Sequence, residues 1–385
     1  MALTVHEALD LKALERFKLV AGLNGLNNNI SRVGLIDHED WQKVTDTVIT
    51  GEFLFSNFLL IKDHPEKILE YIKRFIDSDV ACFALKTIYF DAFPDEVIDY
   101  ANKHKFPLFT FDETYIEDII LDIDQALNIH SQTAKLQGYI DHMIQEETDP
   151  LKVRALALKL NKQFSNHFIA ASITSTDQNL TTQLMMSTLT QVLGRKCTSI
   201  TYEDTLLLIC SFNPRTHSDD NHHYMQDYVL DALSACGFDL TKCIIGLSTP
   251  KHSLGTMGRA ILESRYALEY SGLKQIHLSE FSTLGIYQVL IPNMNNPWFY
   301  SYYESMIQKI LRYDEKNDTD LLYTAQTYVE CDTNIQKTSE KLFQHVNTVR
   351  YRIKKIKEIL EIDTLDGMKY ESMALAIHLY NLHNR

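Results

Sequence analysis

Long apolar runs are missing from this sequence of 385 residues. The longest, FLFSNFLLI at residues 53–61, is far shorter than the roughly 20 apolar residues that a membrane-spanning helix requires. The opening stretch, MALTVHEALDLKALERF, mixes charged with apolar residues and lacks the pattern of a secretory signal. We therefore expect a cytoplasmic chain without a membrane partner.

Metal-binding and catalytic patterns are missing too. The six cysteines are scattered without the CxxC spacing of a zinc site, which also argues against a disulfide framework and for a reduced compartment. The sequence has no GxxxxGKS or GxxxxGKT phosphate loop, no GxGxxG and no HExxH. Histidines and aspartates gather in one polar loop, but their spacing matches no common metal site. They are His217, Asp219, Asp220, His222 and His223. The sequence thus predicts no enzyme, no metal, no cofactor and no catalytic residue.

Positive charge is scarce over most of the chain, whose formal net charge is −14. Residues 1–130 hold 23 Asp and Glu against 12 Lys and Arg, so this segment as a whole cannot offer a surface for phosphate groups. Between Lys337 and Glu358 the balance reverses, with seven Lys and Arg against two Glu. A polyanionic partner would explain such a patch in an acidic protein, and a solvated basic face on a terminal helix is the plainer alternative.

The first part of the chain, residues 1–113, has strand and helix patterns in alternation. Apolar runs at 53–61 and 80–90 are rich in strand-forming residues. Helical spacing is present at 64–78 and again at 93–105, before the short strand PLFTF. This succession predicts an α/β layer structure whose sheet is at least partly parallel.

The rest of the chain divides into an α+β part and an all-α part. Residues 151–291 combine a strand from Phe168, a helical pattern at 180–194 and a hairpin at 197–210. This mixture predicts an α+β domain of the ferredoxin-like kind. Turn residues then mark a boundary, and residues 297–385 have helical patterns throughout.

A long helical segment at residues 114–150 joins the first two parts. Four of its apolar residues recur at spacings of 4, 3 and 4, as in the seam of a coiled coil. They are Ile116, Ile120, Ile123 and Leu127. The run covers less than two heptads, which leaves two interpretations open: a helix packed on its own domain, or a dimerising signal helix.

The basic segment has the pattern of two helices joined by a tight turn. Asn334 can cap a short helix that ends near Leu342, and Asn347 can cap a second one. Apolar residues of the second helix form one stripe at helical spacing. They are Val349, Ile353, Ile356 and Leu360. The basic residues remain on the exposed faces, as in a helix-turn-helix whose second helix enters the major groove with its N-terminal residues at the bases.

This segment closely resembles the C-terminal helix-turn-helix of the PucR-type (purine catabolism regulator) transcription factors. Their signature His-x-Asn-Thr-x-x-Tyr-Arg stands at residues 345–352, with Val346 where many members have Arg. The related Fis-type domain supports base and phosphate contacts at these positions. The DNA contacts that we predict are Gln344, His345, Asn347, Thr348, Arg350, Tyr351, Arg352 and Lys355.

The resemblance extends over the whole chain. Residues 1–113 are similar to the PucR-type N-terminal domain, and the middle part is similar to the GGDEF-like domain of PucR- and CdaR-type regulators. The turn at Thr201–Thr205 lacks the two glycines that let a cyclase backbone approach a nucleotide, and the first strand lacks a carboxylate for Mg²⁺. The resemblance therefore implies a catalytically degenerate domain that couples signals.

Strand ends in the first part are the expected site of a small-molecule effector, since α/β folds build pockets there. PucR-type regulators are thought to sense metabolites, and the family implies small nitrogenous compounds, purines or amino acids. The candidate residues are Thr50, Gly51, Glu52, Ser56, Asn57 and Lys86.

These patterns and the resemblance predict a multidomain transcription regulator whose partners are double-stranded operator DNA and a small-molecule effector. A homodimer or higher homo-oligomer is expected, because a single helix-turn-helix reads only a few base pairs and two half-sites supply the missing specificity. Two alternatives remain. One is a signalling enzyme with a nucleotide-binding GGDEF-like domain, and the other is an adaptor whose basic end binds a protein.

Overall fold

The computed structural model describes residues 3–36, 48–146, 149–175, 197–212, 221–361 and 367–384. These residues form two compact units, Met1–Gly138 and Tyr139–Arg385. In the described part of the chain, no helix has both the length and the apolar character that crossing a membrane requires. The helix expected at 180–194 lies outside the described residues. So do His217, Asp219 and Asp220 of the expected polar loop, and the side chains of His222 and His223.

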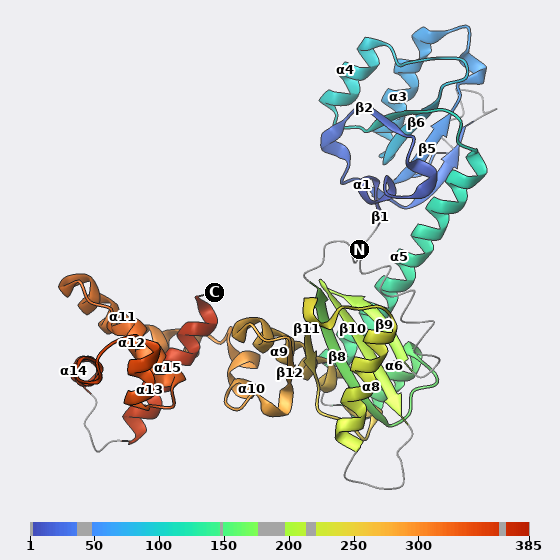
Figure 1. Ribbon diagram of the computed structural model, residues 1–385. Coiled ribbons are helices and arrows are strands. Elements are labelled where there is room, and N and C mark those ends of the chain that lie inside the picture. Colours follow the sequence, from blue (N-terminus) through green and yellow to red (C-terminus); the bar gives the residue numbers. More distant parts are fainter. Residues whose placement is uncertain are drawn as a thin grey trace. The chain divides into compact units, whose positions relative to one another are not determined.

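The first unit is built on a five-stranded sheet with the strand order β2-β7-β6-β5-β4 (Figure 1). β4 to β7 run parallel, and β2 pairs antiparallel with β7 at one edge. The strands are β2 (Lys18–Ala21), β4 (Arg32–Leu35), β5 (Glu52–Ser56), β6 (Cys82–Lys86) and β7 (Leu108–Phe111). A separate two-stranded sheet pairs β1 (Leu3–Thr4) with β3 (Asn29–Ile30). The predicted α/β part with a partly parallel sheet is confirmed.

Side chains of the central strands alternate between the two faces of this sheet, as the two-residue period of a strand requires. Leu54 and its neighbours face α3 (Ile68–Asp77) and α4 (Asp95–Lys103). Phe53 and Phe55 face the opposite side, which α1 (Val5–Ala8) and the start of α5 (Ile116–Gln145) cover. Because both faces are buried, these strands appear in the sequence as continuous apolar runs.

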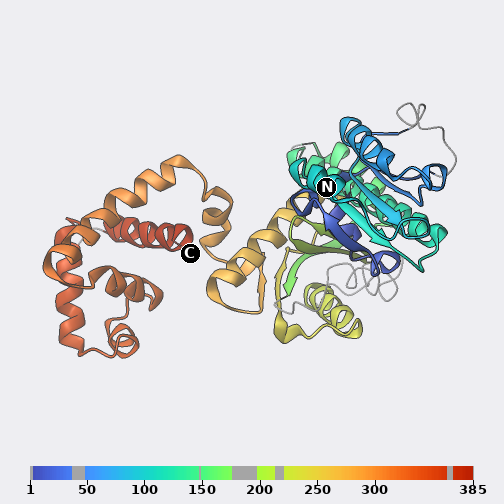
Figure 2. The ribbon, with the colours of Figure 1, turned by 90° about the horizontal axis from the view of Figure 1, so that it is seen from above.

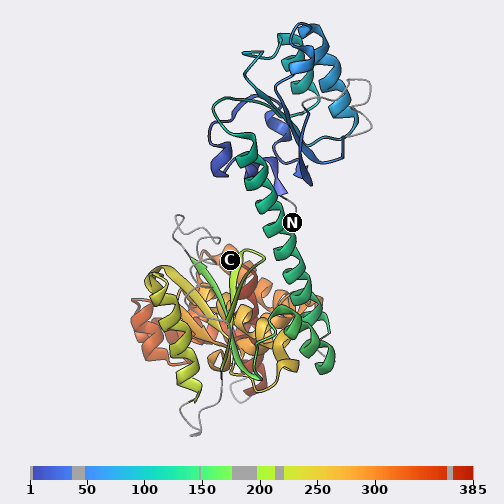
Figure 3. The same ribbon diagram turned by 90° about the vertical axis from the view of Figure 1, so that its right-hand side faces the viewer.

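α5 packs its first turns onto the first unit (Figure 3). Ile119 and Ile123 are fully buried there, whereas Ile120 is 37% exposed. Three of the four residues of the 4-3-4 seam pack on the core of the first unit: Ile123 is buried, and Ile116 and Leu127 are partly buried. Of the two interpretations left open, these contacts support a helix that packs on its own domain.

The second unit begins with a five-stranded mixed sheet of order β12-β11-β8-β10-β9. Its neighbours pair antiparallel, except that the short β12 runs parallel to β11. The strands are β8 (His167–Ser175), β9 (Cys197–Tyr202), β10 (Thr205–Phe212), β11 (Cys243–Leu247) and β12 (Leu278–Glu280). The expected hairpin is confirmed as β9 and β10, which are joined at Glu203 and Asp204.

Two helices cover the opposite faces of this second sheet. α8 (Asn221–Ala235), which includes His222 and His223 and so replaces part of the expected loop, packs Val229 and Leu233 on one face. α9 (Met257–Lys274) lies on the other face, so close to β11 that a Cβ atom at Gly246 would be 2.0 Å from the Leu268 nitrogen. Only glycine permits this approach of helix and strand. A shorter helix, α6 (Pro150–Leu160), precedes β8.

The chain after Asn296 consists of helices and short connections in its described part, as predicted (Figure 2). The helices are α11 (Pro297–Asn317), α12 (Leu321–Glu330), α13 (Ile335–Lys341), α14 (Val346–Ile359) and α15 (Gly367–His383). They share one apolar core, to which Ala267 of α9 and Tyr287 of α10 (Tyr287–Leu290) also contribute.

Candidate nucleic-acid interface

The basic segment lies on a scaffold of three helices, α12, α13 and α14. α13 begins at its predicted cap, Asn334, whose Oδ1 accepts a hydrogen bond from the Lys337 backbone N–H at 3.0 Å. Ile335 and Leu342 pack against the helical core as expected, although both are only half-buried. The local prediction of a short capped helix before a turn is confirmed.

The turn between α13 and α14 has the hydrogen bonds of a Schellman motif. The Phe343 N–H donates to the Glu340 carbonyl at 3.2 Å, and the Gln344 N–H donates to the Ser339 carbonyl at 3.0 Å. Phe343 holds the left-handed position at φ 53°, and its side chain is 96% exposed. A left-handed conformation costs a residue with a Cβ roughly 1–2 kcal/mol, and glycine is usual here. The sequence pattern did not single out this strained, exposed aromatic residue beside the second helix.

α14 begins two residues earlier than the sequence predicts. Its N-cap is His345, whose Nδ1 accepts a hydrogen bond from the Asn347 backbone N–H at 3.2 Å. The expected cap at Asn347 is therefore wrong, because that residue already belongs to the first turn of the helix. The Asn347 side chain is exposed and does not cap the start of the helix.

The two sides of α14 differ sharply in character. The predicted apolar stripe is confirmed, since all four of its residues are buried in the core of the C-terminal helices. On the opposite side, four exposed residues recur at helical spacing, and we call them the reading face. They are Asn347, Arg350, Tyr351 and Lys354. Two of these four residues are cations, and the next exposed residue on this side of α14 is Glu358.

Six of the eight predicted DNA contacts are exposed. The exceptions are Arg352 and Lys355, which are half-buried and bound to neighbours. Arg352 Nη1 donates to Thr324 Oγ1 of α12 at 3.1 Å, and Lys355 Nζ lies 3.1 Å from a Glu358 carboxylate oxygen. Lys354 is absent from the predicted contacts but belongs to the reading face. Its place three residues after Tyr351 was the signal that could have identified it.

Arg352→Ala should lower the free energy of unfolding by about 1 kcal/mol, because it removes a hydrogen bond to the buried Thr324 hydroxyl. That bond connects α14 to α12. Urea denaturation of the full chain measures the change. Lys354→Ala is the matched control, since it removes an exposed cation of the same helix and should change stability by less than about 0.5 kcal/mol. Equal losses in the two variants would contradict a positioning role for Arg352.

The candidate effector residues are divided between two edges of the first sheet. β5 spans five residues, so its ends are about 13 Å apart. At the edge where β5 begins lie Thr50, Gly51 and Glu52. At the edge where β5 and β6 end lie Ser56, Asn57 and Lys86. One small pocket cannot include both groups.

Residues at both edges make contacts within the domain, and at the second edge Asn57 Oδ1 accepts a hydrogen bond from the Leu59 N–H at 2.9 Å. Glu52 is 4% exposed, accepts a hydrogen bond from the Ile49 N–H at 3.1 Å and lies 3.6 Å from Arg32 Nε. It therefore holds the start of β5 in place. At the other edge, the half-buried Lys86 ammonium donates to the Thr114 carbonyl at 3.1 Å. An ammonium has three donors, so two remain for other partners.

The turn at Thr201–Thr205 is held by side chains of the protein itself. The Tyr202 hydroxyl donates to Asp141 Oδ1 at 2.6 Å, and Glu203 forms an ion pair with Arg265 at 2.5 Å. Burial, together with the Asp141 carboxylate, raises the pKa of Tyr202, so the phenol remains protonated at neutral pH.

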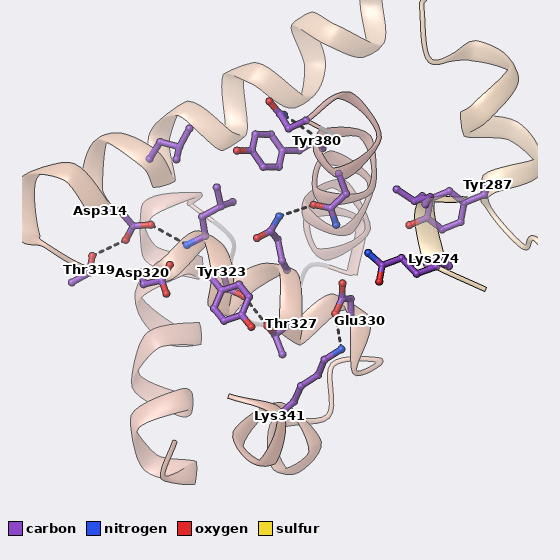
Figure 4. Close-up of a pocket in the computed structure, with 17 residues that line it drawn as sticks. Lys274, Tyr287, Asp314, Thr319, Asp320, Tyr323, Thr327, Glu330, Lys341 and Tyr380 are labelled. Carbon is purple, nitrogen blue, oxygen red and sulfur yellow. Dashed lines mark hydrogen bonds and ion pairs between the residues drawn. The ribbon is translucent and has the colours of Figure 1, made fainter. Parts of the chain in front are cut away.

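A groove of ≈ 980 Å³ lies beside the three-helix scaffold (Figure 4). Its walls come from α11, α12, α15 and the end of α9, with polar side chains that include Lys274, Asp320 and Gln326. The ion pair between Glu330 and Lys341, at 2.7 Å, forms one border and joins α12 to α13. A polar cavity therefore adjoins the first helix of the helix-turn-helix.

Two family models match the chain, one near each end. Residues 7–127 match the purine catabolism regulatory protein-like family, and residues 321–379 match the PucR C-terminal helix-turn-helix domain. The second match contains α12, α13 and α14, and with them the reading face.

Curated relatives from Bacillus subtilis (strain 168) are similar over parts of the chain. The DNA-binding transcriptional activator AdeR is 37% identical over 87 residues, which cover 23% of this chain and 21% of AdeR. The proline-responsive transcriptional activator PutR is 31% identical over 129 residues, 33% of this chain and 31% of PutR. The purine catabolism regulatory protein is 22% identical over 170 residues, 44% of this chain and 28% of that protein.

The matched segments thus span between 21% and 31% of the length of these relatives. The two domain matches nevertheless fall on two structures described above, the α/β unit and the three-helix scaffold. The chain therefore carries a domain of the purine catabolism regulatory protein-like family at residues 7–127 and a PucR C-terminal helix-turn-helix domain at residues 321–379.

Proposed function

We propose that this chain is a transcription regulator that binds operator DNA through the reading face of α14. The observation that carries the proposal is an exposed basic face on the second helix of a packed helix-turn-helix, in a chain of net charge −14. Such a helix presents its first turns to the base edges in the major groove. Two relatives, AdeR and PutR, are transcriptional activators by name, which supports the same role here. DNA as the partner would place the chain in the cytoplasm.

We assign separate roles to the residues of this interface. Arg350 and Asn347 are suited to base edges, because arginine pairs with guanine and asparagine with adenine through two hydrogen bonds each. Lys354, one turn further along α14, is suited to a phosphate group. Arg352 acts indirectly, by fixing α14 against α12 through Thr324. The exposed Gln344, His345 and Thr348 flank the first turn and complete the predicted contact surface.

We further propose that the regulator is at least a dimer. The first turns of α11 present aromatic residues that remain partly or largely exposed: Trp298 is 82% exposed, Tyr300 48% and Tyr302 36%. Exposed apolar patches of this kind mark interaction sites. With Ile123 of α5 buried inside its own domain, this surface is the better place for two subunits to meet.

The effector site is proposed at the edge of the first sheet where β5 and β6 end, near Asn57 and Lys86. In α/β folds ligands bind outside the carboxyl ends of parallel strands. PutR is proline-responsive by name, which supports a small nitrogenous effector. Thermal shifts of the full chain with a panel of amino acids and purines identify the compound. Asn57→Ala should abolish the shift and Thr50→Ala, at the other edge, should preserve it. The reverse result would contradict this location.

We propose that the middle domain is a degenerate GGDEF-like module of the ferredoxin-like kind that couples signals. β8, the β9–β10 hairpin, α8 and β11 follow one another as in a ferredoxin-like unit, with β8 and β10 in the centre of the sheet. In the turn at Thr201–Thr205, Tyr202 binds Asp141 and Glu203 binds Arg265, which supports the loss of cyclase chemistry. Formation of a cyclic dinucleotide from GTP and Mg²⁺ by the purified chain would contradict this proposal.

Recovery of genomic DNA on the immobilised full chain, followed by footprinting and light scattering, tests the function. We expect two protected half-sites, about 34 Å apart between centres, bound by a dimer. The affinity should fall steeply with salt concentration, since phosphate contacts release counterions. Trp298→Ala should weaken the dimer, and Tyr115→Ala, another exposed aromatic residue, should not. A monomer that protects one isolated half-site would contradict the dimer, and no enrichment of DNA would contradict the function.

A further inference from the structure

Two cysteines stand directly opposite one another in the β9–β10 hairpin. The register pairs Cys197 with Cys210, at the end of the hairpin farthest from its turn. Tyr202 and Thr205 close a two-residue turn, and such a turn closes on a hydrogen-bonded pair. Along an antiparallel ladder, hydrogen-bonded and non-hydrogen-bonded residue pairs alternate. The cysteine pair lies five pairs beyond the Tyr202–Thr205 pair and is therefore a non-hydrogen-bonded pair.

This position has the geometry that a disulfide requires. In a non-hydrogen-bonded pair the Cα atoms are about 4.5 Å apart and the side chains lie close together. Disulfides join Cα atoms that are about 4.4–6.8 Å apart. Both cysteines pack against the core beneath α8, and both are free thiols. None of the other register pairs in the described strands joins two cysteines.

The two thiols differ in access and in acidity. Cys210 is fully buried, and burial raises its pKa. Cys197 is half-buried at the start of β9, and its hydrogen bond with Cys210 lowers its pKa. The Tyr228 hydroxyl lies 4.0 Å from Cys197 Sγ, and this contact also lowers the pKa of Cys197. Cys197 is therefore the thiol that reacts first with a solute, and Cys210 is the partner held behind it.

We propose that Cys197 and Cys210 form a redox-active dithiol that hydrogen peroxide closes to a disulfide. The Cys197 thiolate attacks one peroxide oxygen, and the other oxygen leaves as hydroxide, which takes up a proton to become water. The resulting sulfenic acid is attacked by the Cys210 sulfur, which releases a second water molecule. In sum, two thiols and one hydrogen peroxide give one disulfide and two water molecules. The two sulfur atoms together lose the two electrons that the peroxide gains.

The disulfide would bind the edge strand β9 to β10 at the open end of the hairpin. In a reducing compartment such a bond is transient and reports oxidation, whereas it would persist in an oxidising one. The spacing of the six cysteines in the sequence did not reveal this pair, because Cys197 and Cys210 meet through the register of two strands. The site lies in the middle domain and is independent of the proposed DNA contacts.

Thiol counting and peptide mapping of the full-length protein test the proposal. After treatment with hydrogen peroxide, the number of titratable thiols under denaturing conditions should fall from six to four. Trypsin releases residues 197–215 as one peptide, and Cys197 and Cys210 are the two cysteines in it. This peptide should lose the mass of two hydrogen atoms, and dithiothreitol should restore it.

Variants separate this pair from other thiols. Cys197→Ser should prevent the loss of mass, whereas Cys236→Ser and Cys331→Ser, which remove other half-buried thiols, should leave it unchanged. The mapping of the unaltered chain tests the pair even where a variant folds poorly. Six thiols after oxidation would overturn the proposal. So would a gain of two oxygen atoms on Cys197 with Cys210 still free, because a partner within reach would have intercepted the sulfenic acid.

Discussion

Arg350→Ala should weaken operator binding by about 1–3 kcal/mol, roughly 5- to 150-fold in the dissociation constant. Arg350 is exposed at the start of the second turn of α14, within the N-terminal part of the helix where a recognition helix meets base edges. Its guanidinium can donate two parallel hydrogen bonds to one guanine, and alanine leaves those acceptors unpaired. The buried neighbour Val349, on the other side of α14, is untouched by the change, so the fold should be retained.

Fluorescence anisotropy with an operator duplex at several salt concentrations measures this loss. Arg350→Ala should reduce discrimination between the operator and a duplex altered at one base pair. Lys354→Ala should instead weaken binding to all sequences alike and lower the salt slope by about 1, as expected for a phosphate contact. Lys103→Ala, an exposed cation of α4, is the matched control. Unchanged affinity and selectivity in the Arg350 variant would contradict the proposed orientation of α14.

Ile123→Ala should lower the stability of the N-terminal domain by about 2–5 kcal/mol, because it opens a cavity in a core that cannot fully collapse. Ile123 is fully buried, and next to it the Asp122 carboxylate accepts a hydrogen bond from the Ala13 N–H at 3.0 Å. Ile120 belongs to the same predicted seam but is 37% exposed. Ile120→Ala should therefore cost less than about 1 kcal/mol.

Urea denaturation of the full chain, with limited proteolysis to locate the segment that unfolds first, distinguishes the two variants. In Ile123→Ala we expect the protease to cleave first within residues 3–138. In Ile120→Ala the cleavage pattern should be close to that of the unaltered chain. An intersubunit seam would behave differently. In that case both variants would reduce the dimer measured by light scattering, and neither would destabilise the isolated domain.

Local patterns in the sequence identified most elements. The central strands of the first sheet, β5, β6 and β7, were recognisable because burial makes them apolar runs, such as FLFSNFLLI around β5, whereas the more exposed β2 and β4 were not predicted. The second helix of the helix-turn-helix was recognisable because one side must be apolar to pack, which produced the stripe from Val349 to Leu360. Both signals depend on spacing along one element, and spacing is directly visible in a sequence.

The details of the candidate interface depended on neighbours that spacing does not reveal. Asn347 is a common capping residue, but the backbone places the cap at His345, two residues earlier. Arg352 has the same chemistry as Arg350 and lies two positions away. It turns inward because Thr324 of α12 offers an acceptor at 3.1 Å. Which of two arginines meets DNA was thus decided by a residue 28 positions away in the chain.

The sequence by itself determined that an α/β part comes first and a helical part last, and it identified the helix that carries the basic charge. Each of these follows from composition or from periodicity within about a dozen residues. The tertiary structure alone decided that Ile123 faces its own domain, that the candidate effector residues lie at two edges, and that Cys197 meets Cys210. The physical reason is that such contacts join residues through packing and strand register, which depend on the whole fold and leave no mark on local spacing.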